Sequence, residues 1–405
     1  MTKNEIIKAA LKVWGREFYL NTSLTQVARE LGVSKPALYR HFKNKQALLD
    51  AMYEYFMNDY AAFIRPGYEQ AAALAGKAEK MTLLLKIVVE YYARNADAFL
   101  FSLFNVYGSR DQVSMEQDLD SLGIDMRAIY AVEEEYENPL LLRISFTTII
   151  FAVANFYKLG HSFDKTPSED NIQKLIGAVG VIISRGLSFK RERVDALDYE
   201  ELEKRIFGVI GTVEDNSLLK AVAQAVAEAG PWNASMDMVA KRSGLSKSSL
   251  YAHFKSKKDM LRQLFMGEFK RLFAFARDCL RRSSRPEEQF YLGIFSIVAY
   301  LCSHSEILLA MDWIRTRRLD LGKPMKPGIL GVFDEIDFAE AGNIEQNEIT
   351  SALGGDKRQM SQWVIFLIIS ILMRRSEGMS FTEVPNDNIR TLYRFITLGL
   401  EGFNS

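Results

Sequence analysis

Apolar residues recur at helical spacing near the start of the chain, and the same pattern returns just past its middle. Steps of three and four residues place these side chains on one face of a helix, which predicts an amphipathic helix packed on a core. The two stretches are therefore predicted to fold alike. Their apolar positions are Ile7, Ala10, Leu11, Trp14 and Phe18 in the first, and Leu219, Val222, Ala223 and Val226 in the second.

A short second helix and a tight turn follow in each stretch. Ser23 and Gln26 form a capping box, which starts a helix. Gly32 and Gly244 end the second helix of the two stretches, because a left-handed backbone conformation costs least at glycine. Leu38 then returns to the core, so the pattern predicts a helix-turn-helix in each stretch. The side chains expected in the cores of the two modules are Leu38, Phe42, Leu250 and Phe254.

An internal repeat relates the two stretches. Residues 34–45 read SKPALYRHFKNK and residues 246–257 read SKSSLYAHFKSK, so eight of twelve positions are identical at an offset of 212. A weaker match continues downstream at an offset of 208, where Tyr92 and Leu100 fall against Tyr300 and Leu308. A period of about 200 residues is too long for a solenoid and indicates two tandem copies of a complete protomer. We therefore expect one chain to fold as a pseudo-dimer.

The remaining segments read as bundles of helices, and the whole chain is predicted to be all-α. At 405 residues, with 48% hydrophobic and 25% charged residues, the chain is expected to form several domains. A pair of apolar helices ends each half, over 139–160 with 171–187 and over 358–375 with 387–402. The expected domains are a helix-turn-helix at 1–56, a helical domain at 57–190, a linker at 191–215, a second helix-turn-helix at 216–268 and a second helical domain at 269–405.

Charge is distributed unevenly along a chain that is neutral overall. Residues 1–56 hold nine Lys and Arg against five Asp and Glu, and residues 216–268 hold eight against four. Each helix-turn-helix module therefore carries a net positive charge, and the rest of the chain is acidic. Two basic modules are the electrostatic footprint expected of a sequence-specific DNA-binding protein.

The two helix-turn-helix segments resemble a known family. VARELGVSKPALYRHFKNKQALL, which begins at Val27, resembles the DNA-binding domain of the TetR family of bacterial repressors, and VAKRSGLSKSSLYAHFKSKKDML, which begins at Val239, resembles it again. The resemblance is close over residues 4–56 and 216–268, whereas the other segments share only the family's helical character and length. It implies an effector pocket in each helical domain and a four-helix dimer interface built from the paired apolar helices.

The resemblance also assigns roles to side chains on the second helix of each turn, the reading helix. Such a helix presents side chains to base edges, while flanking cations and hydroxyls hold phosphates. Asp237 replaces Thr25 and Ala252 replaces Arg40, so the two readers are not equivalent. The implied base contacts of the first copy are Lys35, Pro36 and Ala37, and its phosphate contacts are Thr25, Tyr39, His41 and Lys45, with Arg40 contacting either. The matching residues of the second copy are Lys247, Ser248, Ser249, Tyr251, His253 and Lys257.

These observations favour a sequence-specific DNA-binding transcriptional regulator, in the form of a ligand-responsive repressor. Two unlike readers on one chain imply an asymmetric operator, and the expected partners are double-stranded DNA and a small-molecule effector. The alternative is a helical interaction module whose second helix-turn-helix no longer binds DNA, which Asp237 and Ala252 favour. An enzyme is the other competing class, but the chain contains no HExxH, P-loop, Rossmann or GxSxG motif.

The sequence is also expected to be soluble and cytoplasmic. Its start runs directly into a charged amphipathic pattern rather than into a signal peptide. The longest apolar runs, 144–154 and 363–373, are shorter than the about 20 residues of a membrane span.

No metal or cofactor is expected. Cys279 and Cys302 are the only cysteines, too few for a disulfide scaffold or a tetrahedral metal site. The acidic stretches 133–137 and 334–348 lack the glycine and the ligand spacing of a calcium loop, so they are expected to be solvated loops.

Overall fold

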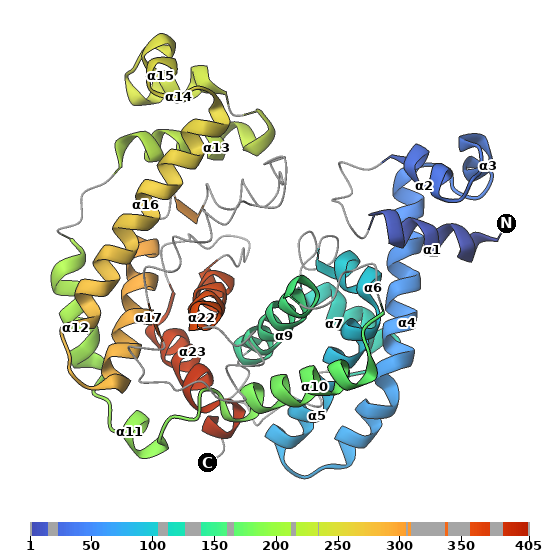
Figure 1. The fold of residues 1–405 in the computed structure, drawn as a ribbon, viewed down its shortest axis with the longest axis horizontal. Helices are drawn as coiled ribbons and strands as arrows, with labels where there is room; N and C mark the ends of the chain where they lie inside the picture. Colours follow the sequence, from blue (N-terminus) through green and yellow to red (C-terminus); the bar gives the residue numbers. More distant parts are fainter. Residues whose placement is uncertain are drawn as a thin grey trace. The chain divides into compact units, whose positions relative to one another are not determined.

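The computed structural model confirms the all-α prediction, since every element it describes is a helix. The chain divides into two compact units, one ending at Ser184 and the other running from Arg185 to Phe403. Each unit holds a helix-turn-helix module followed by a helical bundle (Figure 1). The structure describes residues 2–14, 23–103, 112–125, 139–159, 166–211, 216–233, 235–304, 307–308, 337–338, 357–372 and 384–403.

In the first unit, a single long helix leads from the reading module into the bundle. This helix, α4, spans Lys45–Ala73 and contacts α1 of the module and α5 of the bundle. The module consists of α1 (Lys3–Trp14), α2 (Leu24–Glu30) and α3 (Lys35–Tyr39). The bundle adds α5 (Lys77–Arg94), α6 (Ala96–Phe101), α7 (Gln112–Ser121), α9 (Pro139–Leu159) and α10 (Glu169–Arg185).

The second unit repeats this plan. The helix that corresponds to α4 is α16 (Lys257–Leu280), and it packs along α17 (Pro286–Ser303). The module consists of α13 (Ser217–Asn233), α14 (Met236–Ser243) and α15 (Lys247–His253). The unit also contains α11 (Arg191–Asp195), α12 (Tyr199–Ile210), α22 (Lys357–Leu372), α23 (Asn386–Leu398) and the 3-10 helix η5 (Leu400–Phe403).

The two modules keep the same register. Helices α14, α15 and α16 begin 212 residues after α2, α3 and α4, so the repeat in sequence is a repeat in structure. Ser23 and Gln26 form the expected capping box, and Ser235 accepts a hydrogen bond from the Met238 amide. Gly32 and Gly244 have φ angles of 65° and 70°, the left-handed conformation predicted for them.

Small and apolar side chains form the core of each module as predicted. Leu38, Phe42 and Leu250 are buried, whereas Phe254 is only half-buried. In the bundle of the first unit, aromatic rings from α4, α5, α6 and α9 pack together, with the Tyr60 and Tyr91 ring centroids 5.0 Å apart. Aromatic pairs of this kind stabilise a core beyond the area that they bury.

Helix α9 is more apolar than the sequence run over 144–154 suggested. Leu140–Tyr157 has a mean hydropathy of 1.6, and it is the one stretch among the described residues long and apolar enough to cross a membrane. However, 61% of this stretch is buried inside the structure. The Tyr157 hydroxyl donates a hydrogen bond shared between the carbonyls of Tyr92 and Ala93 on α5, at 3.0 and 2.7 Å. These contacts are those of a core helix.

The segment expected to be a linker is instead folded into the second unit. Residues 191–215 contain α11 and α12, and α12 packs along α17. On α12 the carboxylate of Glu203 is buried, and Arg390 of α23 donates to its two oxygens at 2.8 and 2.9 Å. Tyr291 donates a third hydrogen bond at 2.6 Å. Removing one partner of such a buried pair typically costs about 3–5 kcal/mol, so α12 is a structural part of this unit.

Some of the sequence expectations fall outside the described residues. These are the acidic stretch 133–137, most of the stretch 334–348, and Phe18 in the apolar face of the first helix. In the part of the chain that the structure describes, no group of three or more His, Cys, Asp or Glu residues is close enough to hold a metal ion.

Candidate nucleic-acid interface

The first reading helix, α3, is anchored by one side chain and exposed elsewhere. Leu38 is buried beneath it, while Ser34 precedes it in extended conformation and Pro36 lies in its first turn. Proline fits here because the first amides of a helix need no intrahelical partner. The predicted contact residues Lys35, Pro36, Tyr39 and Arg40 are exposed, and Ala37 and His41 are half-buried.

The second reading helix, α15, is held in the same way. Leu250 is buried, and the Ser246 hydroxyl caps the helix by accepting a hydrogen bond from the Ser249 amide at 3.0 Å. The Ser249 hydroxyl lies 2.8 Å from that of Ser246, so the cap already engages one of the two predicted base-contacting hydroxyls. Lys247, Ser248 and Tyr251 are exposed, and Ser249 is half-buried.

Two tyrosines at equivalent positions are the most informative side chains of the interface. Tyr39 on α3 and Tyr251 on α15 are each 45% exposed, among the few large apolar side chains in the described residues that remain at the surface. A single exposed ring is ordinary at a protein surface, but here the repeat keeps the same amphipathic ring exposed at the same position of both reading helices. The two modules therefore present the same kind of side chain at equivalent surface positions.

The start of α4 adds a cation to the first interface. Asn44 caps this helix by accepting a hydrogen bond from the Ala47 amide at 2.8 Å, and Lys45 is its first residue. Partial burial lowers the pKa of Lys45. A helix start carries a partial positive charge, so Lys45 and the dipole together attract an anion such as a phosphate. In the second module, the side chains of the equivalent Lys257 and of His253 lie outside the described part of the structure.

A contact that the sequence did not reveal distinguishes the second module. Thr25, the second residue of α2, is exposed, and Asp237 takes the same place on α14. The Asp237 carboxylate lies 2.9 Å from the ammonium of Lys247 on α15, and this hydrogen bond raises the pKa of Lys247. The sequence showed both residues, but their pairing depends on how the turn brings α14 and α15 together. Their separation of ten residues gave no local signal.

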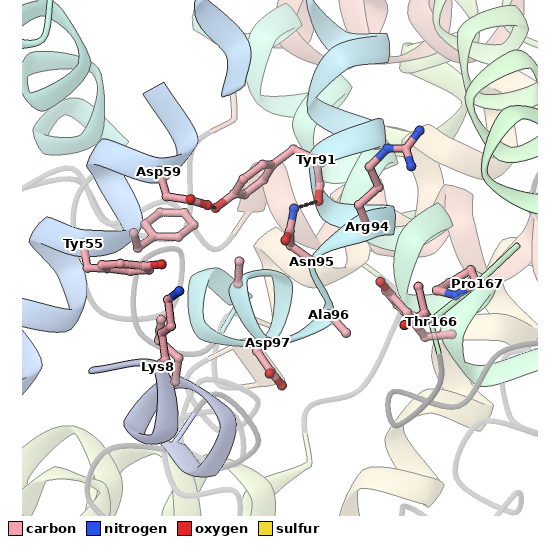
Figure 2. A pocket seen from close by; sticks show the side chains of 14 residues that line it. Lys8, Tyr55, Asp59, Tyr91, Arg94, Asn95, Ala96, Asp97, Thr166 and Pro167 are labelled. Carbon is pink, nitrogen blue, oxygen red and sulfur yellow. Dashed lines mark hydrogen bonds between the residues drawn. The ribbon is translucent and has the colours of Figure 1, made fainter. Parts of the chain in front are cut away.

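A cavity in the first unit lies where the reading module meets the bundle (Figure 2). It has a volume of about 460 Å³ and is lined by residues of α1, α4, α5, α6 and α9 and of the segment before α10. Tyr91 donates a hydrogen bond to Asp59 at 2.8 Å, and burial together with this carboxylate raises the pKa of the Tyr91 hydroxyl. Lys8 from α1 and Asp97 from α6 also line the cavity. The sequence pointed to no pocket residues because these elements are far apart along the chain.

Comparison with known proteins finds the same family at both modules. Bacterial regulatory proteins of the tetR family match residues 6–52 and again residues 218–264. An uncharacterized HTH-type transcriptional regulator, YerO of Bacillus subtilis, is 33% identical over 22% of this chain and 30% of its own length. The tetracycline repressor protein class A from transposon 1721 of Escherichia coli is 46% identical over 13% of this chain and 26% of its own length.

A longer and weaker match reaches beyond the module. The fatty acid metabolism regulator protein of Bacillus subtilis is 22% identical over 34% of this chain and 71% of its own length. The chain covers less than a third of the length of these first two relatives, and the matched stretches are 89 and 57 residues long. Because the match occurs at both modules, the chain carries the helix-turn-helix domain of the tetR family of bacterial regulatory proteins twice in tandem.

Proposed function

We propose that this protein is a sequence-specific transcriptional regulator that reads DNA with two non-identical modules on one chain. The observation that carries the proposal is the pair of reading helices, each anchored by a buried leucine and each presenting a tyrosine to solvent at the same position. The excess of basic residues in both modules supports the same partner, because phosphates supply most of the affinity for DNA of any sequence.

Within each reader, the side chains are assigned to two groups according to the part of the DNA that each is expected to contact. Tyr39 at the end of α3, His41 just after it, Lys45 on α4 and Thr25 on α2 are assigned to phosphates, which fix the orientation of the protein on the duplex. Lys35, Pro36, Ala37 and Arg40 belong to α3 itself or its end and are assigned to the major groove. In the second module, Tyr251, His253 and Lys257 take the phosphate roles and Lys247, Ser248 and Ser249 the base roles.

This division predicts different outcomes for two substitutions in the first module. Lys45→Ala should weaken binding to the operator and to random duplex DNA about equally, and should reduce the slope of log affinity against log salt by about one unit. Ala37→Ser, which introduces the residue of the second reader, should change the preferred sequence and leave the affinity for random DNA unchanged. Fluorescence anisotropy over a salt series measures both. Equal losses on operator and random DNA for Ala37→Ser would count against the assigned groove face.

We further propose that one chain supplies both halves of the dimer that separate subunits would otherwise form. Two compact units, each with a module and paired apolar helices, support this pseudo-dimer. A homodimer reads a palindrome because its two readers are identical. Here Pro36 and Ala37 offer apolar contacts suited to a thymine methyl, whereas Ser248 offers a hydroxyl, so the operator should be asymmetric.

We also propose that the regulator is a repressor released by a small molecule. The cavity of the first unit supports this proposal, because its lining joins α1 of the reading module to α4, α5 and α6 of the bundle (Figure 2). A ligand that contacts both parts can favour one orientation of the reader over another, and its differential affinity for the two states sets the size of the response. The tetracycline repressor, a relative of this chain, is named for repression.

Ligand response is testable by filling the cavity. A molecule that copurifies with the chain, identified by native mass spectrometry, should raise the midpoint of thermal unfolding and weaken operator binding when added back. Ala96→Phe should abolish both effects, because Ala96 lines the cavity, whereas Ala196→Phe at an exposed position of the second unit should abolish neither. Undiminished effects in Ala96→Phe would place the effector elsewhere.

A further inference from the structure

The second module contains an ion pair at the place where the first module has none. On α15, the ammonium of Lys247 donates to the carboxylate of Asp237 on α14 at 2.9 Å, and the two side chains remain 53% and 65% exposed. Helices α14 and α15 lie against each other at the end of α16 (Figure 1). The pair therefore joins the two helices of the turn on a surface that is open to solvent.

The first module shows what the same lysine does without the acid. Thr25 stands at the position of Asp237 and carries no charge. Lys35, the equivalent of Lys247, extends over the ring of Tyr39, with its ammonium 5.9 Å from the ring centroid. In the first module the cation is thus directed along the reading helix, whereas in the second it is directed back to the preceding helix.

This difference changes how each module meets a polyanion. In the second module, the Asp237 carboxylate already neutralises the Lys247 ammonium, so a phosphate must compete with it. If Lys247 leaves the pair, the carboxylate stands unpaired at a position assigned to a phosphate contact in the first module. If the pair stays intact, it carries no net charge to neutralise a phosphate. Either way the second module releases fewer counterions on binding, and counterion release sets the affinity for DNA of any sequence.

We propose that Asp237 lowers the affinity of the second module for DNA of any sequence, so that the first module anchors the chain and the second occupies its half-site only where its base contacts form. The inference rests on the proposed function as a DNA-binding regulator. Weak phosphate binding leaves the discrimination between sequences unchanged, but base contacts then form a larger share of the binding free energy, so this module binds weakly wherever they are missing.

Exchanging the two residues tests the inference. Asp237→Thr should raise affinity for a 30-base-pair random duplex about three- to tenfold at fixed salt and steepen the salt slope by about one unit. Thr25→Asp should have the opposite effect in the first module. Glu228→Gln is the matched control, because it removes the same charge from α13 by breaking the Glu228–Arg242 ion pair instead.

Different results would contradict the role of Asp237 and the proposed DNA-binding function. A larger gain for Asp237→Thr than for Glu228→Gln, with unchanged thermal unfolding, supports the role of Asp237. Equal gains show that only net charge matters and overturn that role, as does no gain for Asp237→Thr. Absence of salt-dependent DNA binding by the unmodified chain would overturn the proposed function itself.

Discussion

Placing a glutamate in the first turn of either reading helix is expected to reduce operator affinity by at least about 100-fold. Ala37→Glu and Ser249→Glu are equivalent substitutions at the third helical position of α3 and α15. Each introduces a carboxylate on the side assigned to the major groove, where it repels phosphates and displaces base contacts worth about 1–3 kcal/mol each. Both variants are expected to lose operator affinity, because tight binding needs both half-sites.

The fold should survive these substitutions. Ser34 and Ser246 precede the two helices, and a glutamate three residues after such a serine completes a capping box, which stabilises a helix start. The midpoint of thermal unfolding therefore serves as the control and should stay the same or rise slightly. Operator binding by Ser249→Glu as tight as that of the unmodified chain would show that the second module does not read DNA, as the alternative of a decayed module requires.

Local chemistry explains why the modules could be predicted from the sequence. The capping serines, Gly32 and Gly244 each act on residues only a few positions away, so the helix starts and ends that they cause can be predicted from neighbouring residues. The same holds for Leu38, whose burial follows from helical spacing. The internal repeat, at an offset of 212 residues, then predicted the second module.

The features that the sequence did not reveal depend on contacts between distant residues. Helix α12 was expected to be part of a linker because the partners of Glu203, chiefly Arg390, lie far along the chain. Without them a buried glutamate is unfavourable, so the pattern over 199–210 alone did not indicate a docked helix. The pairing of Asp237 with Lys247 and the lining of the cavity have the same origin.

Two unlike readers on one chain are expected to act together on one DNA site. The DNA sequences that the chain prefers should therefore differ strongly between the two half-sites. Each reader contributes several base contacts, and each contact changes affinity by about 5- to 150-fold, which follows from about 1–3 kcal/mol. Lys35, Pro36 and Ala37 in one reader and Lys247, Ser248 and Ser249 in the other cannot choose the same bases throughout. The half-sites should therefore differ at several positions.

In vitro selection from random duplexes with the unmodified chain tests this claim most directly. The expected result is one asymmetric sequence with two unlike half-sites, recovered in a single relative orientation, and with both halves required for tight binding. Enrichment of a perfect palindrome would contradict the claim, because it would mean that identical modules from two chains read the two halves.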